Sequence, residues 1–188
     1  MRATDDRYRG EQGKFELALR MIRHEARTGT IRYWTGLSDD RIRKLYTSYF
    51  KFAGTTVKRR RGKSPRQITP LVQSPARTLE SGVIANLLVA NGLVCPEQPP
   101  GPALRNRIDL GHRFCECYET YTVLIKEPAL TFEWSWNLLI SIRRGEELGI
   151  RHCLDCGSSF IYDLLSVPRG GCPVCSMFSP CHRHVALH

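Results

Sequence analysis

The sequence predicts a mainly α protein, in which a helical body is followed by a small cysteine-rich module. Three observations lead to this fold class. Apolar residues recur at helical spacing in several segments between residues 15 and 145, two CxxC pairs lie beyond them, and positive charge is concentrated in the first third of the chain. At 188 residues the chain can bury a real core.

The first predicted helix spans Phe15 to Arg27, where Leu17, Met21 and Ile22 recur at near-helical spacing, and Gly29 is expected to end it. The segment from Thr28 to Tyr46 then fits a helix-turn-helix template. Its turn is placed at Gly36, with apolar template positions at Ile31, Leu37, Ile42 and Leu45. Ser38 is a plausible N-cap, and the second helix is expected to reach about Phe50.

Further helices are predicted on both sides of a proline-rich linker at 96–102. One starts at Ser74-Pro75 and stops at Asn91-Gly92, and the next spans Leu104 to Lys126. The last starts near Thr131, and its apolar residues recur every four positions at Trp134, Leu138 and Ile142. Trp134 and Trp136 form a stripe that is expected in the core or at a subunit interface.

The four cysteines Cys153, Cys156, Cys172 and Cys175 form two CxxC pairs separated by fifteen residues. Four thiolates complete the tetrahedron that Zn²⁺ prefers and leave no position for water or substrate, so the spacing predicts one structural Zn²⁺ per chain. A small hairpin is expected between the two pairs, with strand propensity at Ser158 to Asp163 and a turn at 168–171. The alternatives are a pair of disulfides and chance cysteines in a core. Disulfides are disfavoured because the charged N-terminus lacks an apolar signal segment, which favours a reducing cytoplasmic location.

Other cysteines and histidines compete weakly for this role. Cys181, His182 and His184 follow the second pair and could also bind metal, but two complete CxxC pairs already satisfy the ion. Cys95, Cys115 and Cys117 lie in apolar surroundings and are expected to pack in the core.

The complete prediction is therefore a helical body containing a helix-turn-helix-like unit, with a small C-terminal four-cysteine zinc-binding, zinc-ribbon-like module. Residues 1–150 form the body, which includes a basic region at 1–70, and residues 151–188 form the module and tail. No apolar run approaches membrane-spanning length.

The net charge of +10 resides entirely in the first 70 residues, where 18 Lys and Arg face seven Asp and Glu. This asymmetry indicates a polyanionic partner, and the helix-turn-helix template favours duplex DNA. The densest run is expected to be a flexible phosphate-binding loop, and the alternative is a solvated linker. The predicted DNA contacts are Arg41, Arg43 and Lys44 in the second helix, and Lys58, Arg59, Arg60, Arg61, Lys63 and Arg66 in the basic run.

No catalytic constellation is found. The chain has no Walker-type or dinucleotide-binding glycine loop, no HExxH and no GxSxG. Cys115-Glu-Cys117 is similar to part of a zinc deaminase motif, but a closed four-cysteine site explains the CxxC pairs more simply. We expect no enzymatic activity and no small-molecule substrate.

Two stretches of the chain resemble the FlhC family of flagellar transcriptional activator subunits. Leu37 to Tyr46 resembles the helix-turn-helix region of that family. The C-terminal half of the family is matched by Thr131-Phe132, Trp136, Leu138, Gly145, Leu148, Cys153, Cys156, Gly157, Phe160, Cys172 and Cys175. The two stretches occur in the same order and at similar separation as in the family, and the likeness extends from about Leu17 to Cys175.

This resemblance implies a bacterial cytoplasmic protein that binds promoter DNA together with an FlhD-type subunit and recruits RNA polymerase to flagellar genes. It also implies that the four matched cysteines hold structural zinc. Two other classes fit the same residues. A zinc-ribbon RNA-binding or ribosome-associated protein would also be basic and cysteine-paired. A redox-regulated zinc protein would release its metal under mild oxidation.

Overall fold

The computed structural model describes residues 3–51, 56–95, 106–165 and 172–178. It is mainly helical, with one two-stranded antiparallel sheet near the C-terminal end. The elements are α1 (Ala3–Arg23), α2 (Thr28–Thr35), α3 (Asp39–Tyr46), the π-helical turn η1 (Thr47–Lys51), α4 (Thr69–Val72), α5 (Pro75–Ala90), α6 (Arg107–Leu124), α7 (Phe132–Arg144), β1 (Leu148–His152), β2 (Ser159–Asp163) and α8 (Pro173–Phe178). No helix among the described residues is long and apolar enough to cross a membrane.

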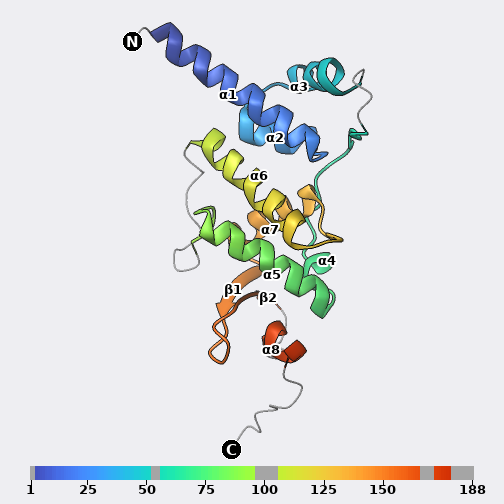
Figure 1. Ribbon diagram of the computed structural model, residues 1–188, viewed down its shortest axis with the longest axis vertical. Helices are drawn as coiled ribbons and strands as arrows, with labels where there is room; N and C mark the ends of the chain where they lie inside the picture. Colours follow the sequence, from blue (N-terminus) through green and yellow to red (C-terminus); the bar gives the residue numbers. More distant parts are fainter. Residues whose placement is uncertain (1–2, 52–55, 96–105, 166–171, 179–188) are drawn as a thin grey trace, which may run out of the picture.

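The molecule is elongated, and its two predicted functional regions lie at opposite ends (Figure 1). Helices α1, α2 and α3 form one end, α5, α6 and α7 form the middle, and the β1–β2 hairpin and α8 form the other end. The mainly α fold class and the C-terminal four-cysteine module are confirmed.

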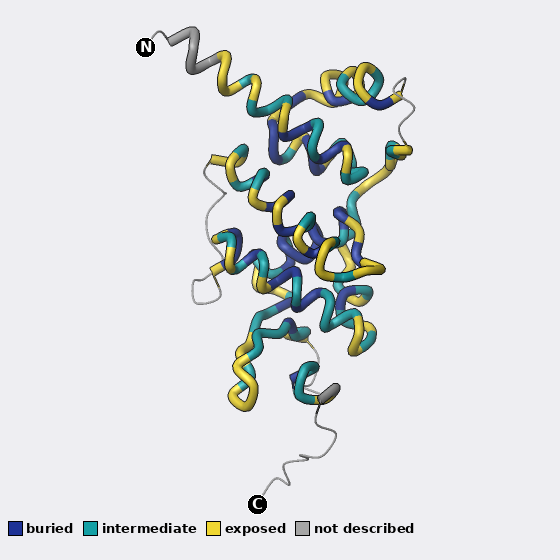
Figure 2. Tube along the Cα trace, in the orientation of Figure 1, coloured by how far each residue is buried: buried dark blue, intermediate teal, exposed yellow. Residues whose placement is uncertain are grey.

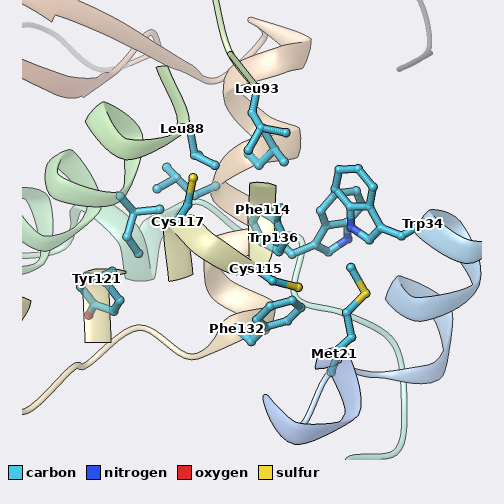
Figure 3. Close-up of a cluster of buried hydrophobic side chains, with 14 of the residues drawn as sticks. Met21, Trp34, Leu88, Leu93, Phe114, Cys115, Cys117, Tyr121, Phe132 and Trp136 are labelled. Atoms are coloured by element: carbon cyan, nitrogen blue, oxygen red, sulfur yellow. The ribbon is translucent and has the colours of Figure 1, made fainter. Parts of the chain in front are cut away.

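One continuous hydrophobic core joins the two ends of the molecule through its middle, and buried residues run along the centre of the molecule (Figure 2). Its centre is an aromatic cluster contributed by α2, α6 and α7 (Figure 3). The Trp34 and Trp136 rings lie 5.2 Å apart, and Phe114 lies 5.0 Å from Phe132. Gly111 lets α6 approach α1, because a Cβ there would lie 2.5 Å from a Leu17 methyl.

The predicted end of the first helix is wrong. α1 ends at Arg23, and Gly29 lies inside α2. The chain leaves α1 through a Schellman motif, in which the Ala26 N–H donates to Met21 O at 3.0 Å and the Glu25 N–H to Ile22 O at 2.9 Å. Glu25 occupies the left-handed position with φ +57°, where a glycine is usual.

The other helices agree with the sequence more closely. The Ser74 hydroxyl caps α5 by accepting from the Arg77 N–H, and α5 ends at Ala90 before Asn91 and a left-handed Gly92. Helices α6 and α7 form within the predicted spans. On α7 the buried face contains Trp136 and Leu138, whereas Trp134 is half-buried. The linker at 96–102 lies outside the described residues.

The border predicted between residues 150 and 151 falls inside β1. Leu148 of β1 and Ile161 of β2 are both fully buried, and both belong to the core of the helical body. Strand β2 packs on α5, and β1 packs on the end of α7. Because the core crosses this border, the hairpin packs as a continuation of the body.

Candidate metal centre and nucleic-acid interface

The first CxxC pair lies in the turn between β1 and β2. The Cys153 N–H donates to Ser158 O at 2.9 Å, and the Gly157 N–H donates back to Cys153 O at 2.9 Å. Gly157 has φ +70°, a conformation that a residue with a Cβ rarely adopts, so the glycine closes this turn. The strand expected at Ser158 to Asp163 forms as β2, but its partner is β1, so the hairpin encloses the first CxxC pair and does not lie between the two pairs.

The second CxxC pair lies at the start of α8. Cys172 precedes the helix, and its carbonyl accepts from the Ser176 N–H at 3.0 Å. Cys175 follows in the first turn of α8, so the helix brings both sulfurs to the same side. The turn predicted at 168–171 lies outside the described residues.

The structure brings the four predicted cysteines together. Their sulfur atoms all lie within 4.8 Å of one another, with Cys153 3.7 Å from Cys175 and Cys156 3.6 Å from Cys172. A disulfide would need about 2.05 Å, so none of these cysteines is disulfide-bonded. Sulfurs placed tetrahedrally at the usual distance of about 2.3 Å around a metal ion would be separated by about 3.8 Å. The geometry is that of a four-thiolate metal site.

The pKa values of Cys156, Cys175 and Cys172 shift for different reasons. A hydrogen bond from Ser158 lowers the pKa of Cys156 to about 6. Contacts with Cys156 and then Cys153 raise the pKa of Cys175 to about 12, and burial raises that of Cys172. Four thiolates this close repel one another unless a cation lies between them. The charge of a divalent metal would allow all four to ionise together.

The remaining cysteines have different surroundings. Cys115 and Cys117 are fully buried as predicted, and burial raises the pKa of each thiol to about 12, so neither is a reactive thiolate near neutral pH. Cys95 is exposed, so its predicted core position is wrong. The alternative ligands Cys181, His182 and His184 lie outside the described residues.

The predicted helix-turn-helix pair is present as α2 and α3. Gly36 ends α2 with φ +68°, and the Ser38 hydroxyl accepts from the Arg41 N–H at 3.4 Å at the start of α3. Thr35 stands at a template position that is usually apolar. It is buried, but its hydroxyl donates to Ile31 O at 2.7 Å and accepts from the Leu37 N–H at 3.2 Å, so the polar group is satisfied.

The three predicted cations of α3 differ in their contacts. Arg41 lies against α1, where it pairs with Glu11 at 3.1 Å and covers the Phe15 ring at 4.9 Å. Arg43 pairs with Asp40 at 2.8 Å on the solvent side. Lys44 has no carboxylate partner among the described residues. Arg43 and Lys44 are therefore better placed than Arg41 to contact a ligand.

The basic run at 58–66 has no regular secondary structure, but hydrogen bonds join it to residues of α2, α3 and the turn before α2. Tyr46 at the end of α3 donates to Val57 O at 3.0 Å, and the Arg27 guanidinium donates to Lys63 O. The Thr30 and Ser64 hydroxyls lie 3.1 Å apart. The run is a loop docked beside α1 and α2.

Within this loop the predicted cations lie mostly in solvent. Arg59 is half-buried with Lys58 beside it, at the seam where α1, α2 and α3 meet. Arg60 pairs with Glu25 at 2.7 Å. The remaining loop cations are exposed and have no carboxylate partner among the described residues, namely Arg61, Lys63 and Arg66.

Sequence reasoning missed a buried carboxylate that organises this end of the molecule. Glu133 of α7 is 3% exposed and accepts from the Arg27 N–H at 2.7 Å and the Thr30 hydroxyl at 3.0 Å. No side chain of the local sequence caps α2, so this carboxylate supplies the cap from a distant helix. An acidic residue in the first turn of a helix is common on dipole grounds alone, so the sequence held no signal for this role.

Comparison with protein-family models and with curated proteins gives no match to this chain. The resemblance to the FlhC family therefore stays a prediction that rests on the residues named for it above.

Proposed function

We propose that this protein is an FlhC-type transcriptional activator subunit that binds duplex promoter DNA. In this proposal it acts in the bacterial cytoplasm with an FlhD-type partner subunit, recruits RNA polymerase to flagellar genes and catalyses no reaction. Helix α3 enters or borders a DNA groove, and the basic loop contacts the phosphates. The four-cysteine site holds one structural Zn²⁺.

The observation that supports DNA binding most strongly is the docking of the basic loop beside the helix-turn-helix pair. The Tyr46 contact joins the end of α3 to the start of the loop, so Lys58 and Arg59 lie beside the helix-turn-helix pair. A lone charge run is usually a solvated segment. A charge run whose backbone is hydrogen-bonded next to an exposed cationic helix is better suited to bind a polyanion of fixed shape, such as duplex DNA.

The assignment of Zn²⁺ is supported by the ligand set. Four cysteine sulfurs favour soft or borderline metals, and a closed tetrahedral site is typical of structural zinc. The hairpin and α8 are too small to form a core of their own, so the ion would supply part of their folding free energy.

The test is a DNA-binding titration at fixed moderate salt with zinc-loaded protein, with and without a coexpressed FlhD-type subunit. A flagellar promoter fragment is compared with a shuffled fragment. We expect tighter binding to the promoter by at least about tenfold, which corresponds to about 1.4 kcal/mol. Equal binding to both fragments would contradict sequence-specific regulation, and structured RNA would then be the next ligand to compare.

Matched variants locate the interface. Arg43→Ala and Lys44→Ala are expected to weaken promoter binding by about 1–3 kcal/mol if they contact bases, and less if they contact phosphate. Lys126→Ala is the control, because Lys126 is exposed beyond the C-terminal end of α6 and carries the same charge. An equal loss of promoter binding in all three variants would mean that the effect comes from net charge alone.

A further inference from the structure

Three arginines of the proposed interface form ion pairs with carboxylates of the same chain. Each pairs with a carboxylate that lies near it in the fold: Arg41 with Glu11 at 3.1 Å, Arg43 with Asp40 at 2.8 Å and Arg60 with Glu25 at 2.7 Å. Only the second pair joins neighbours on one helix, so the other two bring together distant parts of the sequence. The basic end of the molecule is thus partly neutralised by its own carboxylates.

The pair between Glu25 and Arg60 has the most specific geometry. Glu25 Oε2 accepts from Arg60 Nε at 2.8 Å and lies 2.7 Å from the terminal nitrogen of the same guanidinium. Glu25 Oε1 accepts from the backbone N–H of Lys58 at 3.3 Å. A guanidinium that presents two nitrogens to one anion is also the arrangement in which arginine binds phosphate.

Glu25 is an unusual residue for its backbone position. It holds the left-handed conformation that ends α1, with φ +57°, where glycine or asparagine is preferred. A glutamate there costs conformational free energy and adds nothing to the helix end itself. Its contribution is to the loop, because its carboxylate receives both the Lys58 backbone and the Arg60 side chain.

The pair is also accessible to an incoming anion. The Arg60 side chain is 50% exposed and the Glu25 side chain 27%. Both line a hollow of about 320 Å³ at the junction of α1, α6, α7 and the loop, which Arg23, His24 and Thr122 also line. An anion that displaces Glu25 from Arg60 would share this hollow with the Arg23 guanidinium and with the Glu133 carboxylate, which accepts from the Arg27 N–H and the Thr30 hydroxyl.

We propose that the Glu25 carboxylate takes the place of a backbone phosphate in the free protein, and that Arg60 leaves Glu25 for a DNA phosphate when the duplex binds. The inference rests on the proposed function and deepens it. By occupying Arg60, Glu25 weakens binding to any phosphate backbone, whatever its sequence. Glu25 is thereby a determinant of DNA affinity that itself makes no contact with DNA.

The test measures binding to a random-sequence duplex and to heparin across a range of salt concentrations. Glu25→Gln is expected to bind the random duplex about three- to tenfold more tightly, with a slope of log K against log salt steeper by about one unit, because one more phosphate contact forms readily. The protein should also elute from heparin at higher salt. Glu146→Gln removes the same charge from an exposed residue between α7 and β1 and serves as the control.

Two further variants separate the mechanism from misfolding and from net charge. Glu25→Asn removes the carboxylate with a residue that adopts the left-handed conformation readily, so it should keep the end of α1 intact and reproduce the effect. In an Arg60→Gln background, Glu25→Gln should have no further effect. Equal shifts for Glu25→Gln and Glu146→Gln, or an unchanged effect without Arg60, would overturn the inference.

The heparin arm keeps this inference separate from the proposed function. A wild-type protein that binds heparin but no duplex DNA would contradict the proposed function, and a later elution of Glu25→Gln would still support masking of Arg60. A wild-type protein that prefers the promoter, with Glu25→Gln unchanged in both arms, would support the function and overturn the masking.

Discussion

Each of the four cysteine ligands should be needed for metal binding, because the site has no spare donor among the described residues. We expect Cys153→Ser to lose most of its bound zinc. The free energy of unfolding should fall by at least about 3 kcal/mol, because losing the ion removes most of the folding free energy that a four-thiolate zinc site contributes. Metal content per chain and thermal unfolding measure the two effects.

Cys95→Ser is the matched control for that variant. Cys95 is an exposed free cysteine outside the cluster, so its substitution should leave both metal content and unfolding temperature unchanged. If Cys153→Ser also kept its metal and its unfolding temperature, the structural role of the site would be disproved.

A second prediction at the residue scale concerns acid. Two hydrogen bonds from Arg20, and then one with His24, lower the pKa of Glu119 from its ordinary value of 4.5 to about 2. Since the folded state favours the charged form, this stabilisation is complete above pH 4.5 and is lost as the pH falls toward 2. Urea unfolding should therefore show a decrease in stability between these values that is smaller in Glu119→Gln. An equal decrease in the variant would assign the acid sensitivity to other groups.

How well single residues could be predicted depends on where their partners lie. The CxxC pairs were recognisable because each pair is local and zinc chemistry fixes the spacing. Glu133 was not recognisable, since its partner Arg27 lies 106 residues away and only the packing of α7 against α2 brings them together. Glu25 was missed for the same reason, because its two contacts lie in a loop without a periodic pattern.

At the scale of elements, the turn between α2 and α3 can be tested with two glycines. Gly36→Ala places a Cβ on a residue with φ +68° and should cost about 1 kcal/mol, with weaker DNA binding because α3 is reoriented. Gly29 lies inside α2, and a Cβ added there would have no other atom within 4 Å. Gly29→Ala should therefore stabilise the protein by up to about 1 kcal/mol. Urea unfolding distinguishes the opposite signs, and a gain in stability for both variants would contradict the turn.

Element ends were predicted where the chain marks them locally and missed where it does not. Ser38 and Ser74 are hydroxyl caps, and both helices begin beside them. The end of α1 was missed because Glu25, and not a glycine, occupies the left-handed position of its Schellman motif. The β1 strand was also missed, since Leu148 to His152 is short and its partner follows a metal-binding turn.

At the scale of the whole molecule, the metal centre and the helical body share one core. Leu148 and Ile161 carry the hairpin into the cluster formed by α5 and α7, so the hairpin cannot separate without exposing both side chains. Burial of two such residues contributes about 3–6 kcal/mol. Loss of metal should therefore weaken the body as well as the module, unlike in a protein made of two independent domains.

The tryptophans allow this coupling to be measured. Trp34, Trp134 and Trp136 all lie in the helical body, and Trp34 and Trp136 belong to the aromatic cluster. Their fluorescence therefore reports unfolding of the body and not of the four-cysteine module. Removing the metal with a chelator should lower the midpoint of the tryptophan transition by about 5–10 °C, since each kcal/mol corresponds to about 2–4 °C in a chain of this size. Restoring zinc should return the midpoint, whereas an unchanged midpoint would mean that residues 1–150 fold independently of the metal.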